Sequence, residues 1–167
     1  MHHLSNTPPT SCNIGMLSPE AHGSQTGSSS VFLLHVALEL PFALQSLLMA
    51  EHLPFLEMTN TTLVVLKIYG ALAIGTCVGA VLCRSLPEFL PGKRAMALSL
   101  LVYHAIAAAT LMTSPRFVPL SFGPLAESLT ITPERSYAVL HGLAALGFAS
   151  WWQVTLPYVA AAKGKFQ

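Results

Sequence analysis

The chain has 167 residues, the length of a single domain, and it carries very little charge. Charged residues make up 9% of the sequence and hydrophobic residues 53%, whereas about a quarter of the residues in a soluble domain are charged. The mean hydropathy is +0.59. This composition excludes an ordinary water-facing surface. The formal net charge of +1 excludes the basic footprint of a nucleic-acid-binding protein, so we expect no nucleic-acid partner.

The first 30 residues are rich in Ser, Thr, Pro, Gly and His and contain neither Lys nor Arg. They hold too little apolar surface to offset the entropy of ordering, so residues 1–30 are predicted to be a disordered polar tail. A signal peptide would have a basic start and an early apolar core. Because the tail has neither, we expect the first hydrophobic run to be retained as a membrane anchor.

Four apolar runs follow, at residues 31–50, 63–83, 95–112 and 137–162. Each is close to or above the roughly 20 residues that a helix needs to cross a bilayer. Their formally charged residues are Glu39 and Lys67 alone, so no run has the polar stripe of a soluble helix. The sequence predicts an all-α membrane protein, a four-transmembrane-helix antiparallel bundle over residues 31–162 with a short cytoplasmic tail at 163–167.

Polar segments precede three of these runs and resemble helix starts. Residues 28–30 and 60–62 offer capping side chains, and residues 132–134 combine a cap, a first-turn proline and a first-turn acid. Asn60 also begins a sequence with the form of a glycosylation acceptor, but it lies so close to the second run that capping is favoured. The segment 113–136 is interpreted as an interfacial linker, with a cover over the mouth of the bundle as the alternative.

The distribution of Lys and Arg predicts the orientation in the membrane. One side of the predicted bundle carries Arg84, Lys93, Arg94, Lys163 and Lys165, and the other carries Arg116 and Arg135. Both termini are therefore expected to face the cytoplasm. A long polar tail before an uncleaved anchor favours an endomembrane such as the endoplasmic reticulum.

The cysteines are Cys12, Cys77 and Cys83, an odd number with no Cys-x-x-Cys pair. We expect neither a disulfide framework nor a thiolate zinc site. Cys77 and Cys83 are interpreted as small apolar packing residues.

Polar side chains inside the predicted spans are the strongest functional signal, because an ionisable group in hydrocarbon costs at least ~2.5 kcal/mol. These side chains are His35, Glu39, Lys67, Tyr69, Tyr103, His104, Tyr137, His141 and Trp152. His35 and Glu39 are four residues apart, so they share a helix face and can bond each other. In the fourth span, helical spacing predicts an inward stripe of Tyr137, His141, Phe148 and Trp152.

The depth of each group follows from a rise of 1.5 Å per residue. Glu39 and His104 both fall about 13–14 Å from the cytoplasmic side, whereas Lys67 and His141 fall at roughly 23–24 Å. The predicted gap of about 9 Å between His104 and His141 disfavours a haem with two histidine ligands. A metal ion held by His35, Glu39 and His104 is geometrically conceivable, but three ligands without a recognised motif lead us to expect no metal and no cofactor.

Two functions remain open. The first is an enzyme that performs acid/base chemistry on a small lipophilic substrate, as an isomerase, a cyclase or a cofactor-free oxygenase in a biosynthetic pathway. Its predicted catalytic residues are Glu39 and His104, supported by His35 and His141. Tyr103, Tyr137, Trp152 and Lys67 are its predicted substrate contacts. The four-span layout resembles compact membrane enzymes acting on lipophilic substrates, such as sterol isomerases and fungal anthrone oxygenases.

The alternative is a non-catalytic accessory subunit or a carrier of a hydrophobic ligand. In that case the buried polar groups hold the helices together, and the lipid bilayer is the principal partner. Gly75 and Gly79 form a GxxxG match that favours close helix–helix association.

Overall fold

The computed structural model describes residues 29–164, and over this range the chain is helical with no strand. The helices are α2 (Ser30–Leu48), η2 (Ala50–His52), α3 (Asn60–Arg84), α4 (Pro91–Thr113), α5 (Pro124–Ser128) and α6 (Pro133–Gly164). The prediction of an all-α protein is confirmed for the described part of the chain. The predicted tail lies outside the described residues apart from its last two, and so do residues 165–167 of the predicted C-terminal tail.

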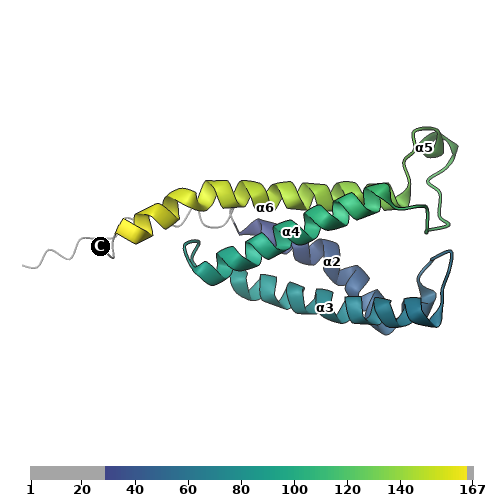
Figure 1. Cartoon of the computed structure of the whole chain (residues 1–167), viewed down its shortest axis with the longest axis horizontal. Coiled ribbons are helices and arrows are strands. Elements are labelled where there is room, and N and C mark those ends of the chain that lie inside the picture. The colour runs from purple at the N-terminus through teal and green to yellow at the C-terminus, as the bar shows by residue number, and fades with distance from the viewer. Residues whose placement is uncertain (1–28, 165–167) are drawn as a thin grey trace, which may run out of the picture.

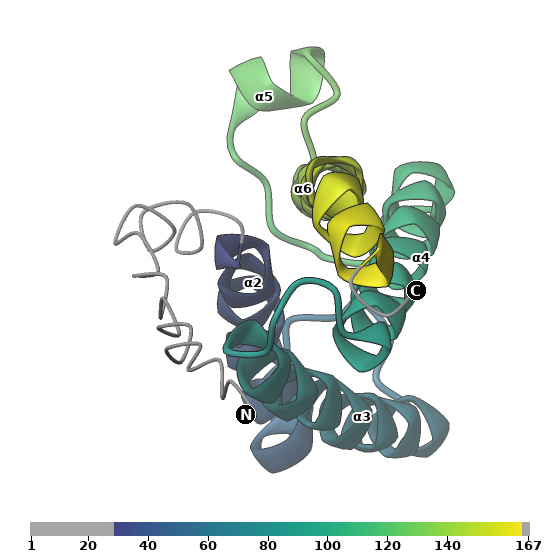
Figure 2. The same cartoon turned by 90° about the vertical axis from the view of Figure 1, so that its left-hand side faces the viewer.

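The four long helices run alternately up and down the long axis of the molecule (Figure 1). α2 packs chiefly on α3, and α4 packs chiefly on α6, with fewer contacts between these two pairs. Seen along the long axis, α2 and α3 lie on one side and α4 and α6 on the other (Figure 2). Any group shared by all four helices must therefore lie at the seam between the two pairs.

Three of the described helices, α2, α3 and α4, are long and apolar enough to cross a membrane. Their outward faces carry large apolar side chains, for example Val64, Leu72 and Ile106, whose exposed fractions are 57%, 67% and 62%. α6 is longer but is not among the three, because polar side chains such as His141 and Gln153 interrupt its apolar sequence. The four predicted spans thus correspond to three membrane-capable helices and a fourth, more polar one.

All four long helices begin before their predicted apolar runs, α2 by one residue and the other three by three or four residues. α3 begins at Asn60, and Thr59 is its cap, because the Thr59 side chain accepts a hydrogen bond from the Thr62 N–H at 3.1 Å. The expectation that residues 60–62 cap this helix is therefore wrong by one position. α4 begins at Pro91, a residue suited to the first helical position. α6 begins at Pro133, as the start signal at residues 132–134 predicts.

The early start of α4 depends on Lys93, which lies outside the predicted spans but is fully buried. Its ammonium donates to Glu88 Oε1 (3.0 Å), to Ser29 Oγ (3.1 Å) and to the carbonyls of Arg84 (3.2 Å) and Leu86 (2.8 Å). These acceptors offset the cost of a cation in the first turn of a helix. The contacts also tie the start of α2 to the turn between α3 and α4.

Gly70 allows α2 and α3 to pack closely. A Cβ atom at this position would lie 2.6 Å from the Ala43 carbonyl oxygen and 2.9 Å from the Leu47 nitrogen. The glycines that the GxxxG match singles out have different surroundings, since a Cβ on Gly75 would meet nothing within 4 Å and one on Gly79 would meet Met96 of the same chain. Within the described chain, the close approach of α2 and α3 depends on Gly70.

At the opposite end, Glu134 holds the loop that precedes α6. Its Oε1 accepts hydrogen bonds from the N–H groups of Phe117 (2.9 Å) and Val118 (2.8 Å). Burial alone would raise the pKa of Glu134, but the hydrogen bonds from backbone N–H groups, Val118 first, lower it to about 2. The short helix α5 projects away from the four long helices (Figure 1). Glu134 thus fixes the base of the loop. α5 does not cover the mouth of the bundle (Figure 1).

Candidate functional site

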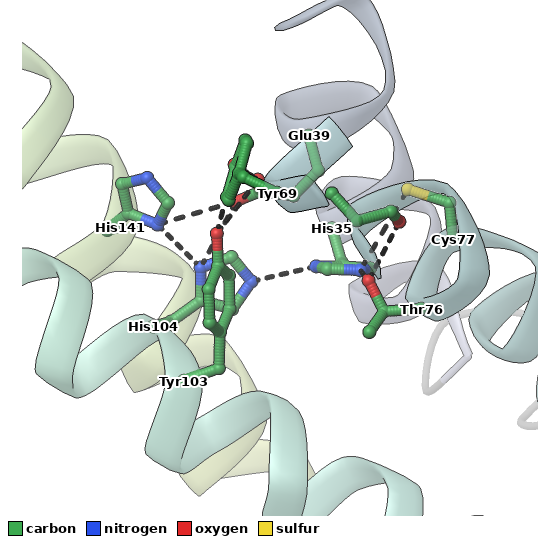
Figure 3. A network of polar contacts seen from close by, with 9 residues as sticks. His35, Glu39, Tyr69, Thr76, Cys77, Tyr103, His104 and His141 are labelled. Atoms are coloured by element: carbon green, nitrogen blue, oxygen red, sulfur yellow. Dashed lines mark hydrogen bonds and ion pairs between the residues drawn. The ribbon is translucent and has the colours of Figure 1, made fainter. Parts of the chain in front are cut away.

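Six ionisable residues from the four long helices meet in one buried cluster at the seam between the helix pairs. Its members are His35 and Glu39 from α2, Tyr69 from α3, Tyr103 and His104 from α4, and His141 from α6 (Figure 3). His35 and His104 are fully buried, and Glu39 and His141 are 2% and 4% exposed. The structure therefore brings together all four residues that the sequence analysis assigns to catalysis.

Glu39 is anchored through one oxygen and unpartnered at the other. Oε2 accepts hydrogen bonds from the hydroxyl groups of Tyr69 (2.6 Å) and Tyr103 (3.0 Å). Oε1 is buried and has no hydrogen-bond partner in the structure. It lies 3.6 Å from His141 Nδ1 and 4.0 Å from His104 Nδ1. The two tyrosines thus orient the carboxylate so that its free oxygen faces two histidines.

The three histidines form a chain that crosses the seam. His35 Nδ1 lies 3.0 Å from His104 Nε2, and His104 Nδ1 lies 2.8 Å from His141 Nδ1. At the α3 end, His35 Nε2 lies 3.2 Å from the Thr76 hydroxyl oxygen. Each of the four contacting helices contributes a side chain to this line, which gives a continuous hydrogen-bonded path (Figure 3).

The hydroxyl of Thr76 sets the direction of the chain. Thr76 donates its proton to the Ala73 carbonyl at 2.8 Å, so it can only accept from the His35 Nε2–H. His35 Nδ1 then carries a lone pair and accepts from the His104 Nε2–H. With neutral rings, His104 Nδ1 is therefore unprotonated and faces both His141 Nδ1 and the free oxygen of Glu39.

The predicted separation in depth between His104 and His141 is wrong. The rise per residue predicts about 9 Å between them, yet their Nδ1 atoms are 2.8 Å apart. α4 and α6 each begin four residues before the predicted span, which shifts each count by about 6 Å and in opposite senses. The two shifts together remove the predicted separation.

The prediction that His35 and Glu39 share a buried helix face is confirmed, but each bonds to another helix instead of to the other. His35 contacts His104 and Thr76, and Glu39 contacts the two tyrosines. Tyr69 is in the polar set of the sequence analysis without an assigned role, and Thr76 is not in that set. Only the rotation of α3 places both residues at the cluster, and no local sequence pattern signals it.

Two of the predicted substrate contacts lie away from the cluster. Lys67 is exposed on α3. Trp152 lies about three turns beyond His141 on α6, where the Arg94 guanidinium is 3.8 Å from its ring centroid. Tyr103 is a cluster member, and Tyr137 is at its edge, 39% exposed with its ring 6.0 Å from that of His141.

The inward stripe of α6 is also displaced from its prediction. His141 and Phe148 face inward as expected, but Trp151 is the buried tryptophan, at 4% exposure, and Trp152 is only half-buried. The inward face is therefore rotated toward Ala144 and Trp151, which leaves Tyr137 and Trp152 at its margins.

The distances within the cluster also limit the kind of metal group that it could hold. Two axial nitrogens on one haem iron lie roughly 4 Å apart, so nitrogens at 2.8 Å do not fit a haem held by His104 and His141. Donor atoms of His35, Glu39 and His104 lie within 4.8 Å of one another, close enough to share one ion. The cluster is thus compatible with a single small cation.

Comparisons with protein-family models, with curated proteins and with solved structures found no match.

Proposed function

We propose that the protein is a membrane-embedded enzyme in which the buried cluster performs acid/base chemistry on a small lipophilic molecule. Glu39 is the proposed proton acceptor, His104 and His141 exchange protons with it, and His35 orients His104. The observation that carries this proposal is the free Oε1 of Glu39, buried between two histidine nitrogens at 3.6 and 4.0 Å. A carboxylate held through one oxygen and free at the other is arranged to take a proton from a bound molecule.

The same proposal takes α6 as a fourth transmembrane helix. It packs along α4, and its outward face carries Val139, Leu143 and Leu146 at 52%, 57% and 65% exposure. Its polar residue His141 turns inward, as expected for an ionisable group in hydrocarbon. The bilayer then surrounds the cluster, both termini face the cytoplasm, and the proposed membrane is that of the endoplasmic reticulum.

The side chains between the cluster and the surface of the molecule favour a lipophilic substrate. The partly exposed side chains of Phe42 and Tyr137 lie beside the cluster, with ring centroids 6.3 Å apart, and Phe42 also contacts Tyr69 at 5.7 Å. A molecule that approaches Glu39 past these rings leaves hydrocarbon and meets aromatic faces, which favours an apolar or aromatic compound.

A second candidate, a non-catalytic subunit or ligand carrier, is favoured by one observation. His35 and His104 are fully buried and bonded to each other, so the histidine chain also works as a polar link between the two helix pairs. In that case the cluster sets how the pairs pack and no molecule is converted.

Metabolite profiling of cells that contain the intact protein or Glu39→Gln at matched abundance separates the two candidates. The glutamine keeps the acceptor for the tyrosine hydroxyls and removes the basic carboxylate. We expect one lipophilic compound to accumulate and its product to disappear in the variant. Lys67→Gln, which changes an exposed charge on α3, is the matched control and should leave the profile unchanged. Identical profiles for Glu39→Gln and the intact protein would reject the enzyme and favour the subunit or carrier.

A further inference from the structure

We propose that Glu39 Oε1, His104 Nδ1 and His141 Nδ1 together bind a divalent transition-metal ion. The three atoms come from α2, α4 and α6 and form a triangle with sides of 2.8, 3.6 and 4.0 Å. The proposal goes beyond acid/base chemistry, since an ion at this position changes which group does that chemistry.

The size of the triangle fits an ion. One point lies about 2.1 Å from all three atoms, and zinc sites have nitrogen and carboxylate-oxygen ligands at about 2.0–2.2 Å. Ligands of a tetrahedral ion at this bond length lie about 3.4 Å apart, and the three observed distances scatter around that value. The donors need to move by only a few tenths of an ångström to reach regular geometry.

The protonation state of His104 also suits a metal ligand. Thr76 donates to the Ala73 carbonyl, which makes His35 Nε2 a donor and His104 Nε2 a donor in turn. His104 Nδ1 is thus left with its lone pair directed at the centre of the triangle. Histidine ligands in metal sites commonly donate their second ring N–H to a partner, and His35 is that partner for His104.

The Glu39 carboxylate likewise has one oxygen available to bind an ion. Both tyrosine hydroxyls bind Oε2, at 2.6 and 3.0 Å, and none binds Oε1. A buried carboxylate oxygen without a partner is costly, and a cation at the triangle centre would satisfy it. The contact of 2.8 Å between His104 Nδ1 and His141 Nδ1 likewise requires either a proton or a cation between the two nitrogens.

The set of His35, Glu39 and His104 is a weaker alternative. It would draw on His35 Nδ1, whose lone pair already accepts the hydrogen bond from the His104 Nε2–H at 3.0 Å. The histidine nitrogens within ion-pair distance of Glu39 Oε1 are instead His104 Nδ1 and His141 Nδ1.

Two imidazoles and one carboxylate suit Zn²⁺ or Fe²⁺, and both ions keep coordination positions open for water or substrate when bound by three such ligands. With an ion present, Glu39 is a ligand, and a water on the ion replaces it as the group that loses or accepts a proton. Metal binding can be measured without any turnover, so its failure and the failure of the proposed enzyme activity are separate results.

The experiment uses the full-length protein in detergent micelles, with His2, His3 and His22 replaced by Ala in every sample so that tail histidines do not bind metal. The probe is Co²⁺, whose visible absorption reports low-coordination nitrogen and oxygen ligands. We expect one bound Co²⁺ per chain, displaced by Zn²⁺. Elemental analysis of protein prepared from cells then identifies the resident ion. Absence of stoichiometric Co²⁺ binding by this parent protein would overturn the proposal without recourse to any variant.

The variants test the ligand assignment. Glu39→Gln, His104→Gln and His141→Gln should abolish the Co²⁺ absorption, and His52→Ala, at an exposed position, should leave it intact. His35→Asn should bind Co²⁺ more weakly by about 10–100-fold, the usual loss for a partner of a ligand. Monodisperse elution and an unchanged helix signal establish that each variant is folded. Loss of binding in His35→Asn together with full binding in His141→Gln would transfer the site to the alternative set and reject ours.

Discussion

Lys93 and Glu39 are both buried ionisable residues, but their hydrogen bonding differs. Lys93 has four acceptors for its ammonium and lies in the first turn of α4, where it fastens a turn. Glu39 has two donors on one oxygen and none on the other. A group whose role is purely structural gains from complete satisfaction, as Lys93 does. The second oxygen of Glu39 instead faces two histidine nitrogens at 3.6 and 4.0 Å, which makes Glu39 the better candidate for chemistry.

Glu134 is a third buried ionisable group, a carboxylate that accepts hydrogen bonds from two backbone N–H groups through Oε1. Its folded-state pKa of about 2 is below the roughly 4.3 of an unfolded glutamate, so its stabilising effect is complete above about pH 4.3 and is lost as the pH falls toward 2. Glu134→Gln should lower the free energy of unfolding at pH 6, by on the order of 3 kcal/mol at most. The difference from the intact protein should shrink as pH falls.

Thermal unfolding of both proteins in detergent at several pH values measures this difference. Glu57→Gln, at an exposed position in the neighbouring loop, controls for the loss of a negative charge at this end of the molecule. A stability difference between Glu134→Gln and the intact protein that stays constant from pH 6 to pH 2 would contradict the assignment.

Helices as elements could be predicted from the sequence, but their starting points could not. The apolar runs are long enough to require helices whatever the rest of the chain does. The sequence does not indicate the start of α4, because Gly92, Lys93 and Arg94 have the composition of a turn. They are helical in the structure because the Lys93 ammonium bonds to Glu88 and Ser29. Ser29 is 64 residues away in the sequence, so no local pattern reveals this contact.

The rotation of the helices was also beyond prediction, and it decides which residues enter the site. Tyr69 reaches Glu39 because α3 lies close against α2 at Gly70, one residue further along. A glycine in an apolar run carries no sign of which neighbour it will meet, and the GxxxG pattern directed attention to Gly75 and Gly79 instead. The acid and the histidines could be selected from the cost of burial, whereas the tyrosines that hold the acid required the packed structure.

This account of α3 predicts opposite effects for two glycines of one helix. Gly70→Ala places a methyl group 2.6 Å from the Ala43 carbonyl oxygen, so α2 and α3 must separate, at a cost of about 1–3 kcal/mol. Gly75→Ala meets nothing within 4 Å and should leave stability unchanged or slightly higher, because alanine is the better helix former.

The fraction of protein that remains monodisperse after heating in detergent compares the two variants with the intact chain. Gly70→Ala should lose monodispersity at a lower temperature, and Glu39-dependent properties such as Co²⁺ binding should weaken with it, because Tyr69 moves with α3. A larger loss for Gly75→Ala than for Gly70→Ala would mean that the exposed face of α3 is covered by a second chain.

At the scale of the whole molecule, the polar cluster and the apolar core share the seam between the two helix pairs. Phe32 of α2 packs edge-on against Phe148 and Trp151 of α6, with ring centroids 5.5 and 5.6 Å apart. The contacts between the pairs are otherwise sparse. The pairs are therefore joined by the same region that carries the proposed chemistry, and a change in the protonation or metal occupancy of the cluster acts directly on how they pack.

The proposed topology depends on α6 crossing the bilayer despite its polar residues, and glycan acceptors can test this. Ala126→Asn completes an acceptor sequence with Glu127 and Ser128 in α5, on the side of the membrane opposite to both termini. Expressed with endoplasmic reticulum membranes, this variant should gain a glycan that a glycosidase removes, whereas an acceptor sequence appended after Gln167 should stay unmodified. Modification of the appended acceptor would place the C-terminus in the lumen. α6 would then lie outside the bilayer, His141 could not meet Glu39 within it, and both the fourth span and the metal site built on it would be untenable.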